Sequence, residues 1–111
     1  MTIRHIVMWR VLGDSTAERR ANAERVRDAF AAMQGRIPGM KHLEVAIDES
    51  GVDYACDVVL LSDFESLEAL SAYASHPEHL RAKQAAGELR IARYQVDYAT
   101  PSSTPNREST P

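Results

Sequence analysis

The chain has 111 residues, of which 44% are hydrophobic and 26% charged, and its formal net charge at pH 7 is −3. This length and composition predict one globular domain and exclude an intrinsically disordered chain. The mild negative charge provides no basic surface for nucleic acid or for an anionic membrane, so neither is an expected partner. The single cysteine, Cys56, excludes an internal disulfide.

Two further features bear on the compartment. No apolar run approaches the roughly 20 residues that a membrane-spanning helix needs. The sequence before Val11 also lacks the long apolar stretch of a secretory signal peptide. A cytoplasmic location is therefore the expectation.

Residues 3–11 alternate with the period of two that is typical of a β-strand. One face of this strand carries Ile3, His5, Val7, Trp9 and Val11. The other face carries Ile6 and Met8 in the middle, between two arginines. A half-exposed strand would have polar residues throughout that second face, so this face too is expected to meet an apolar surface.

The remaining elements follow in the order helix, strand, strand, helix, short helix, strand. A capping box at residues 15–18 predicts a first helix that runs to about Gly35. Strands are expected at 40–47, 54–61 and 89–98, a second helix at 64–74 with its cap near Ser62 or Asp63, and a short helix from Pro77 to about Ala86, ended by Gly87. Residues 99–111, rich in Ser, Thr and Pro, are expected to form a disordered tail.

This order, β-α-β-β-α-β with an extra short helix, predicts a ferredoxin-like α+β domain over residues 1–98. Its four-stranded antiparallel sheet would have helices on one face only. The uncovered face would carry Ile6, Met8, Val59 and Leu61, and an apolar face of this kind favours an interface with a second copy of the chain. The alternative is that the tail covers this face.

Four stretches of sequence together carry a family resemblance. They are IRHIVMW at residues 3–9, IPGM at 37–40, YASHPEH at 73–79 and VDY at 96–98. With these motifs at these separations, the sequence resembles the stress-responsive A/B barrel (Dabb) domain family, a branch of the dimeric α-β barrel superfamily. The resemblance extends over residues 3–98.

The resemblance implies a ferredoxin-like monomer that pairs through sheet faces into a barrel. The first functional expectation is a stress-responsive homodimer with a small apolar pocket that binds a small molecule. The family also includes a polyketide cyclase that needs no cofactor, so a cofactor-free cyclase-like enzyme is the alternative. Other branches of the superfamily contain monooxygenases and heme-degrading enzymes, and such an activity is the second alternative.

The resemblance to the cyclase also implies site residues, because Tyr73 and His79 match its catalytic pair and His5 matches its pocket histidine. In that interpretation His79 acts as the base, Tyr73 donates a hydrogen bond to the enolate oxygen, and His5 orients one of them. This sequence has Val58 where the cyclase has a further histidine, which indicates a different substrate. The expected pocket lining is Val7, Trp9, Phe30, Val58 and Leu60.

Each histidine also has a structural interpretation. His76 precedes Pro77 and could cap the short helix, His79 could bond a backbone carbonyl, and His5 could be a satisfied core histidine. A metal site formed by the three histidines with Glu78 is not expected, because the run lacks the i, i+4 histidine pair of helical zinc motifs. No cofactor is expected.

Overall fold

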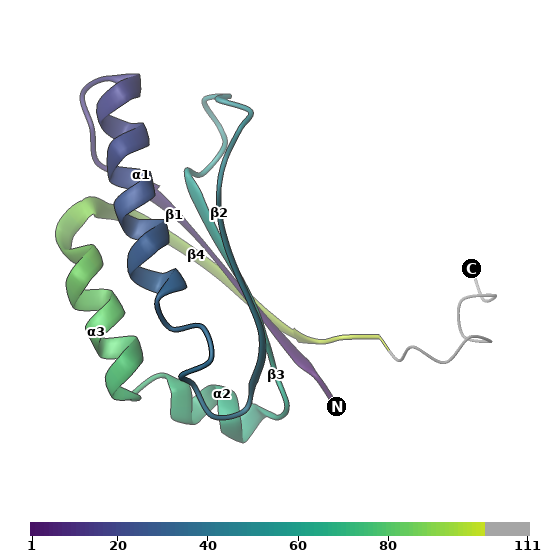
Figure 1. Cartoon of the computed structure of the whole chain (residues 1–111). Helices are drawn as coiled ribbons and strands as arrows, with labels where there is room; N and C mark the ends of the chain where they lie inside the picture. The colour runs from purple at the N-terminus through teal and green to yellow at the C-terminus, as the bar shows by residue number, and fades with distance from the viewer. Residues whose placement is uncertain (102–111) are drawn as a thin grey trace, which may run out of the picture.

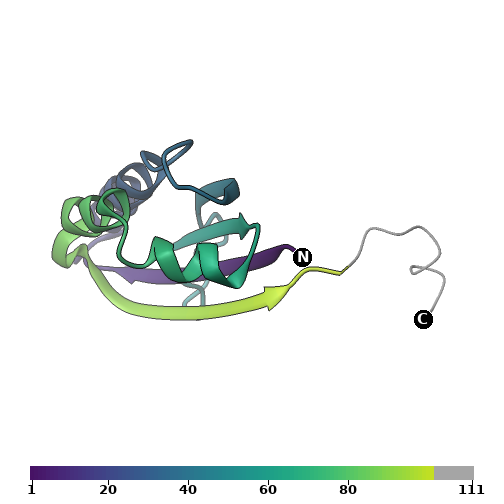
Figure 2. The same cartoon turned by 90° about the horizontal axis from the view of Figure 1, so that it is seen from below.

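A computed structural model describes residues 1–101. It has two layers, a four-stranded sheet and a layer of helices on one face of that sheet (Figures 1 and 2). The elements are β1 (Ile3–Val11), α1 (Thr16–Ala31), β2 (Met40–Ile47), β3 (Val58–Phe64), α2 (Leu67–Tyr73), α3 (Pro77–Ala86), the 3-10 turn η1 (Gly87–Leu89) and β4 (Arg90–Ala99). Most of the predicted tail, residues 102–111, lies outside the described part of the chain.

The strands lie in the order β2-β3-β1-β4, and each neighbouring pair is antiparallel. This confirms the predicted ferredoxin-like α+β fold. The central strand β1 pairs with β3 on one side and with β4 on the other. His5 therefore lies between Ser62 and Asp97. Since paired residues project to the same face of a sheet, this register brings the Asp97 side chain next to His5.

The core lies between the sheet and the helices. The face of β1 that was predicted to point inward is buried, with His5, Val7 and Trp9 each 5% exposed or less. From the helix layer, Val26 and Phe30 of α1 pack against this face, as their 3–4 spacing predicts.

Two predicted boundaries around the first helix and third strand are wrong. Helix α1 ends at Ala31 rather than near Gly35, because the chain enters turns there and Gly35 takes a positive φ of 76°. The third strand begins at Val58 rather than Tyr54. The preceding loop is held instead by Asp48, whose carboxylate accepts hydrogen bonds from the Ser50 hydroxyl and the Gly51 amide.

Phe64 was predicted to begin the second helix, but it is the last residue of β3. It pairs with residues of both neighbouring strands and is fully buried. Helix α2 begins three residues later, because Ser66 is its N-cap and accepts a hydrogen bond from the Ala69 amide at 3.0 Å. The predicted caps, Ser62 and Asp63, are strand residues.

Strand β4 runs one residue further than predicted, to Ala99. Beyond it the Thr100 amide donates a hydrogen bond to the Thr2 carbonyl at 2.9 Å. The predicted start of the tail at residue 99 is therefore slightly early.

The face of the sheet opposite the helices is uncovered, as Figure 2 shows from below. The β1 side chains Ile6 and Met8 point to this face and pair with Leu61 and Val59 of β3, as predicted. Strand β4 adds three apolar side chains that were not predicted for this face: Tyr94, Val96 and Tyr98.

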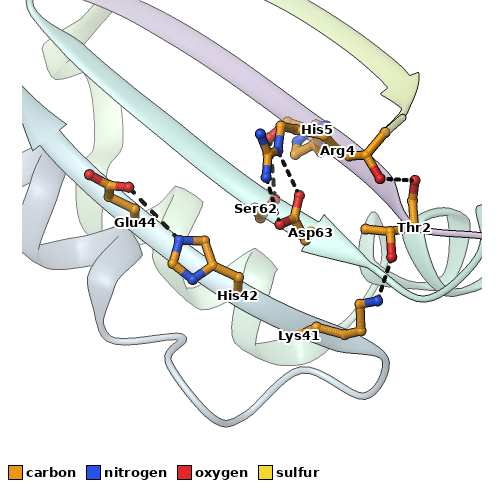
Figure 3. A network of polar contacts seen from close by, with 9 residues as sticks. Thr2, Arg4, His5, Lys41, His42, Glu44, Ser62 and Asp63 are labelled. Atoms are coloured by element: carbon orange, nitrogen blue, oxygen red, sulfur yellow. Dashed lines mark hydrogen bonds and ion pairs between the residues drawn. The ribbon is translucent and has the colours of Figure 1, made fainter. Parts of the chain in front are cut away.

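Charged residues lie at one end of this open face. Arg4 makes two hydrogen bonds to Asp63 across the strands, at 2.9 and 3.0 Å (Figure 3). This pairing holds the pKa of the Asp63 carboxyl below its ordinary value. Among the helices of residues 1–101, none is long and apolar enough to cross a membrane.

Candidate functional site

A cavity of about 470 Å³ lies between the sheet and the helix layer. Its buried part is formed by strands β1 and β3 below and by helices α1 and α2. The side chains there are His5, Val7, Trp9, Leu60, Phe30 and Tyr73. His79 of α3 is half-buried at the cavity wall. Lys83 of α3 and residues 90–93 of β4 complete the lining.

All of the residues singled out from the sequence line this cavity except Val58. Val58 is buried on the same face of the sheet, where it pairs with Trp9 on one side and Ile47 on the other. It belongs to the hydrophobic core rather than to the cavity wall. The period of two predicted its face correctly, but only the position along the strand decides which inward residue reaches the cavity.

Tyr73 and His79 are stacked against each other, with ring centroids 4.1 Å apart and an angle of 24° between the planes. The sequence produces this contact through the junction of two helices. Helix α2 ends at Tyr73, and Pro77 begins α3 with its N-cap at His76. The His76 Nδ1 atom accepts a hydrogen bond from the Glu78 amide at 3.1 Å, which confirms the predicted capping role.

The hydrogen bonds of His79 determine which of its nitrogens is available. Its Nδ1 atom lies 3.2 Å from the Ala74 carbonyl oxygen. A carbonyl only accepts, so Nδ1 carries the proton and Nε2 keeps a lone pair. Burial lowers the pKa of His79 below its ordinary 6.5, which favours the neutral imidazole at pH 7.

Burial shifts the pKa of Tyr73 in the opposite direction from that of His79. It is 4% exposed, and burial raises the pKa of its phenol well above the ordinary 10. The hydroxyl therefore keeps its proton at neutral pH and can donate a hydrogen bond. The cavity wall thus combines a neutral imidazole with a free lone pair and a phenol that can only act as a donor or neutral acceptor.

His5 is held by Asp97, a partner that was not predicted from the sequence. Its Nδ1 atom lies 2.6 Å from Asp97 Oδ1, and because a carboxylate accepts, Nδ1 donates. The His5 ring meets the Tyr73 ring edge-on, with centroids 5.9 Å apart. His5 is therefore a satisfied buried histidine that also borders the cavity. In the sequence, Asp97 is marked only by its place in the VDY stretch. Its contact with His5 depends on how β4 pairs with β1, which the sequence does not show.

Three cations that were also missed line the same cavity: Lys83, Arg90 and Arg93. The guanidinium of Arg90 lies over the rings of Phe30 and Trp9, at 5.3 and 5.8 Å from their centroids. No sequence pattern marks these residues, since Lys and Arg are usual on the exposed positions of a short helix and an edge strand.

The structure does not assemble the conceivable metal set. His76 uses its Nδ1 atom as the cap of α3. Within residues 1–101, no group of three His, Cys, Asp or Glu side chains is placed to hold a metal ion.

Fold and cavity together define a ferredoxin-like α+β domain with a small-molecule-sized space between its sheet and helices. Residues 3–100 match the family described as the Stress responsive A/B Barrel Domain, or Dabb. The chain belongs to this family. This match confirms the family resemblance that the four sequence motifs indicated over residues 3–98.

Solved structures share this fold. A dimeric protein of unknown function with a ferredoxin-like fold, from Bacteroides fragilis, is 26% identical with a TM-score of 0.77, covering 89% of this chain and 96% of that one. A dimeric ferredoxin-like protein of unknown function from Thermobifida fusca is 25% identical with a TM-score of 0.75, covering 90% and 92%.

A third similar structure is the hydroxynitrile lyase from Passiflora edulis, at 16% identity and a TM-score of 0.72, covering 94% of this chain and 97% of that one. At this identity the likeness concerns the fold alone. No curated protein matches the sequence.

Proposed function

We propose that this Dabb protein binds a small, largely apolar molecule in the cavity and transfers a proton on it without a cofactor. The observation that carries the proposal is the stacking of Tyr73 on His79 at the cavity wall, 4.1 Å between centroids. A side chain with a free lone pair and a side chain with a hydroxyl proton then border the same space. The apolar floor formed by Val7 and Leu60 supports an apolar ligand.

The chemistry follows from the protonation states. His79 Nε2 takes a proton from a carbon next to a carbonyl group, and the electron pair of the broken C–H bond moves onto the carbonyl oxygen. Tyr73 donates a hydrogen bond to the resulting enolate oxygen. The enolate carbon can then attack a second carbonyl carbon of the same molecule. The π electron pair of that carbonyl moves onto its oxygen, which takes the proton back from His79. This is the cyclisation that the resemblance to the family's cyclase implies. His5, held by Asp97, orients the Tyr73 ring.

The alternative is a binding protein without turnover, which uses the same cavity. The two readings differ in one measurable property, the exchange of carbon-bound protons. We would incubate phenylacetone, and separately the phenylacetyl thioester of N-acetylcysteamine, with the protein in D2O and follow the loss of the proton signals by NMR.

For an enzyme, the wild-type protein accelerates exchange, and His79→Gln lowers the catalysed rate by about 100-fold or more, the usual contribution of a general base. Tyr73→Phe lowers it through loss of the enolate hydrogen bond. The controls are His42→Gln and Tyr54→Phe, because both residues are exposed and neither lines the cavity. Binding of either probe without accelerated exchange contradicts the enzyme proposal and supports the binding protein.

We also propose that two copies pair through the uncovered sheet face, with Ile6, Met8, Val59 and Leu61 at the contact. Their position on the face without helices supports this, and so does the further apolar surface of β4. The Bacteroides fragilis and Thermobifida fusca proteins are described as dimeric. A twofold pairing would bury the same face of both copies.

A further inference from the structure

The charged side chains in the cavity lining are all basic, although Asp97 bonds His5, which is part of that lining. The lining includes the cations Lys83, Arg90 and Arg93 but no Asp or Glu. No carboxylate in the described part of the chain forms an ion pair with any of the three. Arg81, on the same helix as Lys83 but away from the cavity, does pair, with Glu78 at 2.7 Å. The cavity is therefore a local excess of positive charge on a chain whose net charge is negative.

Arg90 is the cation that reaches deepest into this site. Its side chain is half-buried against Phe30 and Trp9, and its Nη2 atom donates to the Lys83 carbonyl at 3.3 Å. Its Nε atom is buried and, within residues 1–101, has no hydrogen-bond acceptor; the same holds for Trp9 Nε1. Burial and the charge of Arg93 both lower the pKa of Arg90. A cation withdrawn from water next to another cation is unfavourable unless an anion joins them.

We propose that the cavity takes an organic acid, a molecule with a ring-sized apolar body and one carboxylate group held by Arg90, Arg93 and Lys83. The inference rests on the proposed function, since it names the class of molecule that the same cavity would bind. A guanidinium presents paired N–H groups that match the two oxygens of a carboxylate. The apolar body would lie against Phe30, Val7 and Leu60, and about 470 Å³ is ample for one aromatic ring with a short side chain.

The same cations act on the proposed acid–base pair. The charge of Arg93 lowers the pKa of Tyr73, against the larger effect of burial, and the charge of Lys83 contributes to lowering the pKa of His79. The carboxylate would thus lie beside the reacting groups, and the carbon that loses its proton would be close to the acid end of the molecule. An anion bound there would offset the cation and raise the pKa of His79.

The test compares phenylacetate with phenylacetamide, which has the same shape without the charge. Binding to the full chain is followed by the fluorescence of Trp9, the only tryptophan, which lines the cavity. We expect the acid to bind at least about tenfold more tightly than the amide, which is about 1.4 kcal/mol. We also expect the acid, but not the amide, to raise the NMR titration midpoint of His79.

The variants Lys83→Gln and Arg93→Gln should each reduce the preference for the acid over the amide, because each removes one of the charges that hold the carboxylate. Both residues are exposed, so these variants keep the core intact even if Arg90→Gln does not fold. Arg81→Gln is the matched control on α3 and should change neither affinity.

Equal affinity for the acid and the amide would overturn the inference and leave the proposed function standing, because proton exchange is tested on neutral ketones and thioesters. Tighter binding of phenyl phosphate than of phenylacetate would also overturn it, in favour of a phosphate ligand. If neither phenylacetate nor phenylacetamide binds at millimolar concentration, the inference fails, and the exchange assay decides the function independently.

Discussion

The imidazole of His79 lies within 24° of parallel to the phenol of Tyr73, although the two rings come from different helices. The junction between these helices creates the contact, since His76 caps α3 and the proline after it begins the new helix. The Ala74 carbonyl, just after the end of α2, then fixes the Nδ1 proton of His79. A short stretch of chain thus determines both the position and the tautomer of the proposed base.

The first prediction concerns the pH dependence of His79. Burial lowers its pKa below 6.5, so over a window below pH 6.5 the unfolded chain binds more protons at this residue than the folded one. Its contribution to stability is therefore complete above pH 6.5 and is lost as the pH falls through the folded pKa. An NMR titration of the ring protons should give a midpoint below 6.5, and catalysed exchange should rise over the same range.

A matched variant checks the cause of this shift. Lys83→Gln removes a nearby positive charge and should move the His79 midpoint upward, toward the ordinary value. A wild-type midpoint at or above 6.5 would contradict the burial of the imidazole.

The second prediction concerns the bond between His5 and Asp97. Asp97→Ala leaves a buried N–H of His5 without its acceptor, and we expect the free energy of unfolding in urea to fall by about 1–3 kcal/mol. Asp97→Asn keeps an oxygen in place and should cost less. Gln95→Ala is the control. Gln95 donates a hydrogen bond to the other Asp97 oxygen, so this variant leaves the bond between Asp97 and His5 in place. Equal stability of Asp97→Ala and wild type would show that the bond contributes nothing.

The third prediction uses two glycines that both have a positive φ. Gly39 in the IPGM stretch and Gly35 have φ values of 80° and 76°. A Cβ atom at Gly39 would lie 2.6 Å from the Ala69 Cβ atom of α2, whereas one at Gly35 would meet nothing within 4 Å. Gly35→Ala should cost about 1–2 kcal/mol from the left-handed backbone alone, and Gly39→Ala about 1–3 kcal/mol more from overpacking.

Thermal or urea unfolding of the two variants measures this difference directly. If both lose the same stability, the close approach of the IPGM turn to α2 is not tight, and the specific role of Gly39 is refuted.

The fourth prediction concerns the proposed dimer. Met8→Lys and Val59→Lys place a charge at the centre of the uncovered sheet face, and burial of an unpaired charge in an interface is strongly unfavourable. Sedimentation velocity should show a dimer for the wild type and a monomer for either variant. Leu80→Lys on α3 is the control, since Leu80 is equally apolar and exposed but lies on the helix layer. A monomeric wild type would remove the basis of the proposal.

The sequence by itself determined the features that depend on near neighbours along the chain. Alternation in residues 3–11 predicted which face of β1 is buried, and His76 with Pro77 predicted the start of α3, because strand period and helix capping act within a few residues. Together with the family motifs, these local patterns were sufficient for the fold and for Tyr73, His79 and His5 as neighbours of one cavity.

Only the tertiary structure decided which distant residues complete the site. Asp97 meets His5 through the β1–β4 register, and Arg90 and Arg93 reach the cavity because β4 lies at that edge of the sheet. Val58 lies on the predicted inward face of the sheet, yet its position along β3 keeps it out of the cavity lining. Phe64 ends as a strand residue because pairing with two neighbouring strands outweighs the local signals for a helix. Register between strands joins residues far apart in the chain, and no local period carries that information.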